Sequence, residues 1–275
     1  MQSTRSVQAI GAIAALVVAV AGLYLWRRDT APPPAADATP SVAMAPPTTT
    51  ASMPASPTHY PIDARMAAQP SGKAFDLQTA LVDLFGLKTV ESMFRLDEFP
   101  RRLAATIDNL GRSHASATLW PVNPVGGRFA VEERDGATFI GADNGLRYTP
   151  YVLLLETVDL RQLVGIYARL YPSLQRAYEE LGYPGGYLND RLVGVIDILL
   201  ATPEIDAPIQ VRLPPIEGPV RPQRPWLLYE FVDPNLQSLT SGQRALLRMG
   251  SVNQRRIKPR LAEIRRLVTA APAKR

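Results

Sequence analysis

Hydrophobic and polar positions divide this chain into an apolar N-terminal run, a polar proline-rich stretch and a long region of amphipathic stripes. Residues Val7–Trp26 make up twenty consecutive positions without a charged side chain, and a helix of that length covers the ~30 Å hydrocarbon core of a bilayer. Tyr24 lies near the end of the run, and Arg27 and Arg28 follow it, as at a membrane interface. The pattern therefore predicts one uncleaved transmembrane helix within an N-terminal membrane anchor, residues 1–28.

The same run permits a second interpretation, a cleaved signal peptide, because Ala19, Val20 and Ala21 form an A-x-A pattern after a short apolar stretch. The apolar run continues to Trp26, where a cleavable segment would turn polar. We therefore favour the anchor. Arg5 and the amino terminus on one side oppose the arginines on the other side, so the charges assign no orientation.

Residues 29–72 have a different composition, with ten prolines, many Ala, Ser and Thr residues and few charges. Such a segment buries too little apolar surface to offset the entropy of ordering it, so the composition predicts a disordered Pro/Ala/Thr-rich linker with polyproline II character. Long, nearly uncharged spacers after an N-terminal anchor are typical of bacterial domains held outside the inner membrane. By that analogy we expect a single-pass inner-membrane protein with a periplasmic C-terminal domain.

Helical stripes begin after the linker, in a folded domain expected over residues 73–270 and followed by a basic tail, 271–275. Asp76 is suited to cap a first helix that ends at Gly86, and Asp97 to cap a second that ends at Gly111. The apolar positions of each helix recur at intervals that place them on one buried face. These positions are Leu77, Leu81, Leu84 and Phe85 in the first helix and Phe99, Leu103, Ile107 and Leu110 in the second.

Two parts of the domain favour antiparallel strands. Phe129–Ala142 places Asp135 and Gly136 between two β-prone runs, which is the composition of a tight hairpin turn. Ile209–Leu213 and Trp226–Phe231 are expected to form a second strand pair, joined by a proline-rich loop. The sequence thus predicts a small antiparallel β element within a mostly helical domain.

Helices are expected between the two strand regions as well. Thr149 and then Thr157 or Asp159 are suited to open two of them. Pro172 is expected to end one helix and start the next, because proline fits the first turn of a helix but not its interior. Gly182 would end that helix.

Asn189 or Asp190 is expected to cap the following helix, and Thr240 or Ser241 to cap a short one further on. Ser251 starts a long final helix. Its single apolar stripe consists of Ile257, Leu261, Ile264 and Leu267. The predicted fold class is mainly α (α+β), a multi-helix domain with a small antiparallel β element, preceded by one transmembrane helix and a disordered Pro-rich tether.

Several long segments of the domain carry a family resemblance. They are RYTPYV, IYARLYPSLQRAYEELGYPGGYLNDRLVGVIDILLATPE, LYEFVDPNLQ and SGQRALLRMGSVNQRRIKPRLAEIRRL, with TIDNL at Thr106–Leu110. In this order they resemble a proteobacterial membrane-anchored family catalogued as domain of unknown function 3014. The resemblance extends from about Phe75 to Val268. It implies an anchor, a proline-rich tether and a single domain, and it assigns no activity, cofactor or catalytic residue.

Composition and motifs exclude several kinds of chemistry. The chain has no cysteine, which excludes disulfides, thiolate catalysis and cysteine-ligated metals. His59 and His114 are its two histidines, both in expected loops, so histidine-rich metal sites are excluded as well. No phosphate-binding, dinucleotide-binding, serine-hydrolase or zinc-protease motif occurs. We expect a non-enzymatic protein with no cofactor and no metal.

Tyrosines are concentrated between Leu170 and Arg191, which enclose four of the ten in the chain. They are Tyr171, Tyr178, Tyr183 and Tyr187. One interpretation is an aromatic platform that binds a sugar or a peptide, since tyrosine has an apolar face and a polar tip. The alternative is that the rings pack a helical hairpin and hydrogen-bond at its edge. We favour packing, because no converging acid accompanies the rings.

Carboxylates supply the candidates for an enzyme. Asp197 interrupts the apolar helix VGVIDILL, where an acid marks either a functional site or, more commonly, a paired structural acid. Glu179 and Glu180 point about 100° apart on a helix, which does not suit shared acid and base work. An enzyme acting on cell-envelope material would use Asp108, Glu179, Asp190 or Asp197 as its acid.

Positive charge is concentrated at the C-terminal end. Residues 250–275 carry eight Lys or Arg and one Glu, a net charge of +7 against +5 for the whole chain. The candidates for a cationic face are Arg255, Arg256, Lys258, Arg265 and Arg266. Such a face would bind anionic lipid, an acidic protein or nucleic acid. The alternative is a solvated face whose opposite stripe packs on the core.

The segment Pro214–Pro225, with Arg221 and Arg224, suits either a polyproline II ligand or a stiff inter-strand loop, and we favour the loop. The leading hypothesis is a non-enzymatic, membrane-anchored envelope protein whose domain binds another envelope protein or polymer through the four tyrosines and the cationic helix. The alternatives are the enzyme above and a cytoplasm-facing domain that binds anionic lipid or nucleic acid. Nucleic acid is the least favoured partner.

Overall fold

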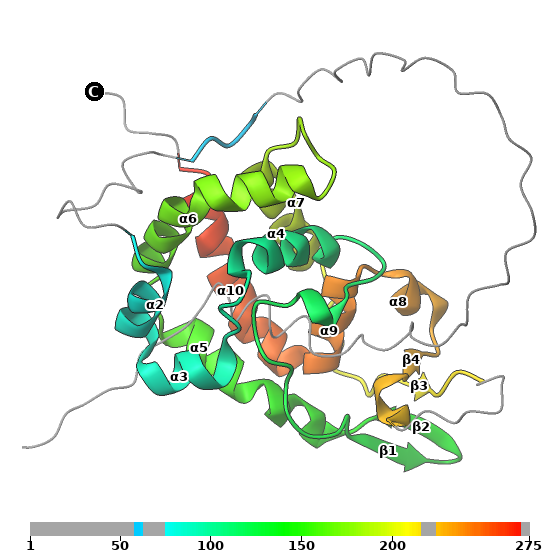
Figure 1. The fold of residues 1–275 in the computed structure, drawn as a ribbon. Helices are drawn as coiled ribbons and strands as arrows, with labels where there is room; N and C mark the ends of the chain where they lie inside the picture. Colours follow the sequence, from blue (N-terminus) through cyan, green and yellow to red (C-terminus); the bar gives the residue numbers. More distant parts are fainter. Residues whose placement is uncertain (1–57, 63–74, 216–223, 271–275) are drawn as a thin grey trace, which may run out of the picture.

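A computed structural model of the chain describes residues 58–62, 75–215 and 224–270 (Figure 1). Helices predominate in these ranges and the strands form two antiparallel pairs, so the predicted helical domain with a small β element is confirmed. The α-helices are α2 Leu77–Phe85, α3 Leu87–Met93, α4 Phe99–Leu110, α5 Thr149–Thr157, α6 Leu160–Glu180, α7 Leu188–Leu200, α8 Pro234–Ser238, α9 Ser241–Met249 and α10 Ser251–Val268. The strands are β1 Val131–Arg134, β2 Ala137–Ile140, β3 Val211–Arg212 and β4 Glu230–Phe231, and the 3-10 helices are η1 Ala117–Leu119, η2 Ala142–Tyr148 and η3 Pro225–Leu227.

No helix in the described ranges has both the length and the apolar composition needed to cross a membrane. The transmembrane part of the predicted fold class, and the single-pass inner-membrane localisation that rests on it, are therefore not borne out by the described structure. The corrected fold class is a mainly helical domain with two small antiparallel strand pairs. Its longest helix, the 21-residue α6, is amphipathic and packs one side on the core. The run Val7–Trp26, most of the linker, residues 216–223 of the proline-rich loop and the basic tail lie outside the described residues.

The core is organised around α4 and α10. α4 packs against α6 and α7, whereas α10 packs against α5, α7 and α9. In Figure 1, α4 lies in front of α10, with α6 and α7 across one end of the domain and the strands at the other end. The predicted stripe of α10 belongs to this core, since Ile257, Leu261 and Ile264 are at most 1% exposed. The cations of α10 therefore lie on its remaining surface.

Three helix starts are fixed by side chains that the sequence indicated. Asp76 accepts a hydrogen bond from the backbone N–H of Thr79 at the start of α2, and hydrogen bonding to Thr79 lowers the pKa of the Asp76 carboxyl. Asp159 accepts from two backbone N–H groups at the start of α6. Thr240 and Gln243 form a capping box at the start of α9.

Two other predicted caps are wrong. α4 begins after Glu98, which has a left-handed φ of 50°, and not after Asp97. The Asp97 carboxylate instead binds the buried guanidinium of Arg102 at 2.5 Å, and this hydrogen bond lowers the pKa of Asp97. Asn189 and Asp190 lie inside α7 and do not cap it, because both side chains bind other parts of the chain.

Pro172 does not separate two helices, contrary to the prediction. It lies inside α6, which is continuous from Leu160 to Glu180. A proline in a helix interior removes one backbone hydrogen bond and costs about 3 kcal/mol relative to alanine. The neighbouring side chains of Tyr171 and Leu174 are buried and hold both halves of α6 against the core. Tertiary packing of this kind offsets the local cost.

The predicted hairpin is confirmed. β1 and β2 pair in the register Val131↔Ile140, and the turn residues Asp135 and Gly136 have positive φ angles of 51° and 76°, as a tight hairpin turn requires. The second predicted pair is β3 with β4. The backbone N–H of Ile140 donates to the carbonyl of Ile209 at 2.9 Å, so the hairpin is joined to the segment that precedes β3.

Candidate functional site

The four tyrosines predicted as partner contacts lie in the hairpin formed by α6 and α7. Tyr171 and Tyr178 are 8% and 6% exposed on α6, and Tyr183 and Tyr187 are half-buried in the connecting loop. Tyr178 stacks on Tyr183 with ring centroids 4.6 Å apart, and Tyr171 contacts Tyr187 at 5.3 Å. The rings therefore pack against one another and do not present a shared aromatic platform.

Gln175 fastens the connecting loop to α6. Its side-chain amide donates to the carbonyl of Gly186 at 2.8 Å, and its side-chain oxygen accepts from the N–H of Leu188 at 2.9 Å. Glycine is required at position 186 because a Cβ would lie 2.9 Å from the ring of Tyr178. The hydroxyl of Tyr171 donates to the same Gln175 oxygen, and burial raises the pKa of Tyr171. The loop is thus held by side chains of α6.

A segment that the sequence places in the linker binds at the start of α7. Asp190 accepts from the backbone N–H groups of His59 and Tyr60, at 2.9 and 2.8 Å. The hydroxyl of Tyr187 accepts from the N–H of Ile62 at 3.0 Å. Residues 58–62 are therefore docked on the helical domain.

Asn189 completes this docking site. Its side chain is fully buried, and its amide donates to the carbonyls of Tyr60 at 2.8 Å and Val268 at 2.9 Å. The hydroxyl of Tyr167 donates to its side-chain oxygen at 3.3 Å. We name the residues Tyr187, Asn189 and Asp190 the α7 corner.

Asp108 is the most buried of the four carboxylates considered for catalysis. It accepts from the guanidinium groups of Arg112 and Arg191 at 2.8 and 3.0 Å, and from the hydroxyl of Tyr183 at 3.1 Å. Gly111 allows this approach, because a Cβ there would lie 2.8 Å from the Arg191 guanidinium. Asp108 is therefore the centre of an ion-pair cluster that links α4 to the α6–α7 hairpin.

The other three candidate carboxylates also have structural partners. Asp197 accepts two hydrogen bonds from Arg265, at 2.5 and 3.0 Å. Glu179 accepts from the amide of Gln175, and Asp190 holds the docked segment. None of the four candidates lines any of the three cavities that we identify in the described residues. The structure therefore does not bring them together at a cavity.

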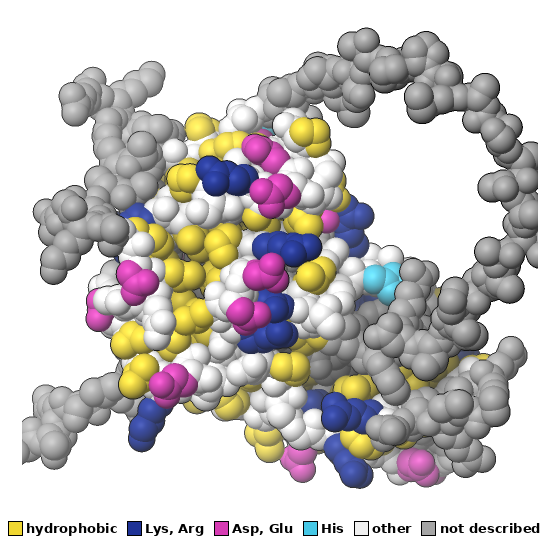
Figure 2. Space-filling view, viewed as in Figure 1, with side chains coloured by type: hydrophobic (Ala, Val, Ile, Leu, Met, Phe, Trp, Pro, Cys, Tyr) yellow, Lys and Arg dark blue, Asp and Glu magenta, His cyan; other side chains and the backbone are white. Residues whose placement is uncertain are grey.

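The five cations predicted to form a binding face on α10 each lie beside a carboxylate. The pairs are Arg255–Asp206 at 2.9 Å, Arg256–Glu156 at 2.5 Å, Lys258–Glu204 at 2.7 Å, Arg265–Asp197 at 2.5 Å and Arg266–Glu263 at 3.9 Å. Figure 2 shows a similar mixture on one face of the molecule, where basic and acidic side chains lie next to each other. The charge of the five α10 cations is therefore largely compensated by neighbouring carboxylates.

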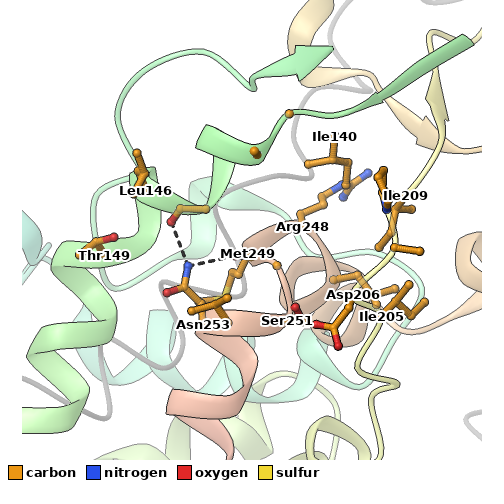
Figure 3. A pocket seen from close by; sticks show the side chains of 18 of the residues that line it. Ile140, Leu146, Thr149, Ile205, Asp206, Ile209, Arg248, Met249, Ser251 and Asn253 are labelled. Atoms are coloured by element: carbon orange, nitrogen blue, oxygen red, sulfur yellow. Dashed lines mark hydrogen bonds between the residues drawn. The ribbon is translucent and has the colours of Figure 1, made fainter. Parts of the chain in front are cut away.

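A cavity of 420 Å³ lies between η2, residues 205–209 and the junction of α9 with α10. Figure 3 shows Leu146 on one side of it and Ile205 and Ile209 on the other, with Met249 between them. Most of the lining surface is apolar. We name this cavity the η2–α10 groove.

Close backbone contacts shape the floor of the η2–α10 groove. Asn253 donates its amide to the carbonyls of Gly145 and Met249, both at 2.9 Å (Figure 3). Asn144 donates to the carbonyl of Arg248 at 2.8 Å. Glycine suits position 145 because a Cβ would lie 3.1 Å from the Met249 carbonyl oxygen. These contacts hold η2 against the α9–α10 junction and position the groove beside it.

Two exposed apolar side chains line the groove. Leu146 is 66% exposed and Val252 is 64% exposed, the two highest values among the large hydrophobic residues that the structure describes. A single exposed apolar side chain is normal on a protein surface. Apolar side chains gathered at a concave surface are typical of an interaction site.

The chemistry available in the groove suits binding. Asp206 is the one carboxylate among its lining residues, and hydrogen bonding from Arg255 lowers the pKa of Asp206, which makes it a poor proton donor. Ser251 lies in the same lining, which includes no histidine. In the described part of the chain, no group of three or more His, Asp or Glu residues is placed to hold a metal ion. The arrangement can hold an apolar group and provides no acid–base pair.

The fold and the groove define a class of protein, a mainly helical domain with a small antiparallel β element and an apolar groove bordered by paired charges. Residues 99–265, more than half of the chain, match the family described as "Protein of unknown function (DUF3014)". The protein therefore belongs to this family, and the resemblance to domain of unknown function 3014 is confirmed. The match assigns neither a group of organisms nor a membrane anchor. No curated protein and no solved structure matches the chain.

Proposed function

We propose that this protein is a non-enzymatic interaction domain that binds an apolar segment of another protein in the η2–α10 groove. The observation that carries the proposal is the position of Leu146 and Val252 on the same groove, since they are the most exposed large apolar side chains described. A partner that covers both removes apolar surface from water, which contributes on the order of 2–4 kcal/mol to binding.

The charges around the groove are largely paired within the chain. Arg134 and Arg256 pair with Glu132 and Glu156, and Asp206 pairs with Arg255. Arg248 is 1% exposed. We therefore propose that the groove recognises the apolar side chains of its partner and not a charge.

Binding is better supported than catalysis. The carboxylates considered for an enzyme, Asp108, Glu179, Asp190 and Asp197, all have hydrogen-bonding partners and line none of the three cavities. The carboxylate in the groove, Asp206, is held by Arg255 at 2.9 Å. An enzyme needs an acid or base within reach of the bound substrate, and the pairing of Asp206 with Arg255 supports binding over catalysis.

Binding of anionic lipid or nucleic acid through α10 is less well supported. Both ligands gain affinity from Lys and Arg side chains whose charge is not already compensated. Each of the six Lys and Arg residues of α10 lies at most 3.9 Å from a carboxylate oxygen. We propose that Arg255, Arg256, Lys258 and Arg265 fix α10 to its neighbours and to the loop before β3.

Site-specific photo-crosslinking in cells that produce the protein tests this proposal. A photoreactive amino acid at position 146 or 252 of the full chain is expected to form a discrete adduct with a partner. Sequencing of the adduct is expected to show a peptide rich in apolar residues. Leu87 is the matched control position, because it is 52% exposed and does not line the groove. Equal adducts from position 87, adducts between two copies of the chain, or no adduct at all contradict the proposal.

A further inference from the structure

We infer that the α7 corner is a binding site for the main chain of an extended peptide, and that residues 58–62 are its resident ligand. The inference is independent of the proposed function, since the two sites lie at opposite ends of α10. Asn189 contacts Val268 at the C-terminal end of α10, whereas the groove includes Ser251 at its start. Figure 1 shows the docked segment in blue beside the end of α10.

The hydrogen bonds between the corner and the segment use main-chain atoms of the segment. Asp190 accepts from two successive amides, Tyr187 accepts from a third, and Asn189 donates to one carbonyl. The ring of His59 lies 3.5 Å from Asp190, but this side chain is 69% exposed. Because the corner recognises backbone groups, its hydrogen bonds do not require the side chains of the segment, as in other modes of peptide recognition through the main chain.

The corner is held in place by contacts that do not involve the segment. Asn189 is buried and bound to the carbonyl of Val268 and the hydroxyl of Tyr167. The N–H of Asn189 donates to the hydroxyl of Tyr171 at 3.1 Å. The carbonyl of Tyr60 supplies the second acceptor of the Asn189 amide, whose first acceptor is the carbonyl of Val268. The segment thus completes the hydrogen bonds of a buried side chain.

The corner and its ligand belong to different parts of the chain. The three corner residues lie inside the family match over residues 99–265, and residues 58–62 lie outside it. The corner thus lies in the part of this chain that matches the family, and its ligand comes from the N-terminal side of that part. Attachment to the same molecule gives the segment an effective concentration on the order of millimolar. A free peptide therefore competes poorly with the attached segment, and it binds the corner only when the affinity of the segment for the corner is reduced.

The contacts also define the kind of peptide that fits. The corner uses the amides of residues 59, 60 and 62 and none from residue 61, so a proline is accepted there, as Pro61 is in this chain. Tyr60 and Ile62 pack against the core, which favours an aromatic and an apolar side chain at these two positions. The ligand class is an extended aromatic–Pro–apolar peptide preceded by a residue with a free amide.

A synthetic peptide of residues 57–63, added to the full-length protein, tests the inference. The variant Tyr60→Gly keeps the amide at position 60 but loses the ring that packs on the core, so its own segment is expected to leave the corner. We expect the peptide to bind this variant at least about tenfold more tightly than the wild type. The same peptide methylated on the Tyr60 amide nitrogen is expected to bind about tenfold more weakly. Adding Asp190→Asn to the variant is expected to weaken the unmodified peptide by a similar factor.

Hydrogen exchange provides a second readout that does not require the free peptide. In the wild type, the amides of His59, Tyr60 and Ile62 are expected to exchange slowly, and Asp190→Asn is expected to accelerate the first two. Equal affinity of the methylated and unmodified peptides, no binding to Tyr60→Gly, or fast exchange at all three amides in the wild type overturns the inference.

Discussion

The side-chain amide nitrogen of Asn189 lies 2.8 Å from the backbone carbonyl oxygen of Tyr60 and joins parts of the chain that are 129 residues apart. The same amide donates to the carbonyl of Val268 at the end of α10. One buried side chain therefore connects the N-terminal segment, α7 and α10, and its removal is expected to affect all three.

Asn189→Ala is expected to lower the free energy of unfolding by about 2–4 kcal/mol, because two backbone carbonyls lose their donor and a small cavity forms. Denaturant-induced unfolding measures the change. The control is Asn235→Ala at an exposed position of α8, for which we expect a change below about 0.5 kcal/mol. Similar changes at the two positions would contradict the structural role of Asn189.

Asp197 and Arg265 form a partly exposed ion pair, with side chains 48% and 35% exposed. A double-mutant cycle with Asp197→Asn and Arg265→Gln is expected to give a coupling energy below about 1 kcal/mol. The coupling is expected to decrease at high salt, because salt screens exposed charges. A substantially larger, salt-independent coupling would show that our account of this pair is wrong.

Pro172→Ala is expected to raise the free energy of unfolding by about 2 kcal/mol, since alanine supplies a backbone N–H inside α6 and has the highest helix propensity, while the freer unfolded chain offsets part of the gain. Pro100 lies in the first turn of α4, where its missing N–H would have no helical partner, so Pro100→Ala is expected to give no increase. Thermal unfolding of both variants measures the difference. A loss of stability in Pro172→Ala would mean that α6 requires the proline.

Tyr148 is fully buried, and burial raises the pKa of its hydroxyl to about 12 from an ordinary value of 10.0. Because the pKa is higher in the folded state, the contribution of this group to stability is complete below pH 10.0 and is lost as the pH rises through about 12. The free energy of unfolding is therefore expected to fall by up to about 3 kcal/mol across this window from Tyr148 alone.

Unfolding by denaturant at a series of alkaline pH values, with tyrosinate absorbance as a second signal, measures this fall. Tyr148→Phe is expected to make it smaller. A remaining part is expected from Tyr167 and Tyr171, whose pKa values burial also raises. Identical alkaline profiles for the wild type and Tyr148→Phe would show that this hydroxyl does not carry the effect.

Local signals were sufficient for most helix starts and for the hairpin. Asp76 caps α2 and Asp135-Gly136 forms the turn through contacts within a few residues, so the pattern of the sequence predicts them. The wrong predictions have long-range causes. Asn189 resembled a helix cap but binds residues far away in the chain. Pro172 resembled a helix boundary, but burial of the flanking turns keeps α6 continuous.

The candidate site was harder to predict because its parts meet only in the folded chain. Residues 140–149, 205–209 and 247–253 contribute to the groove, and nothing in their spacing indicates that they converge. Val252 offered one signal, as an apolar residue outside the buried stripe of α10. The periodicity of α10 correctly placed its cations outside the core. It could not indicate their partners Glu156, Asp197 and Asp206, which lie on other elements.

Methyl NMR of the η2–α10 groove tests the central claim most directly. The probes are two soluble peptides of the same length, one with leucines and the other with serine at the same positions. The account predicts that the leucine peptide shifts the methyl resonances of Leu146 and Val252, leaves those of Leu87 unchanged, and binds at least about tenfold more tightly than the serine peptide. Equal affinity for the two peptides, or equal shifts at Leu87, would contradict the claim that this groove binds apolar segments.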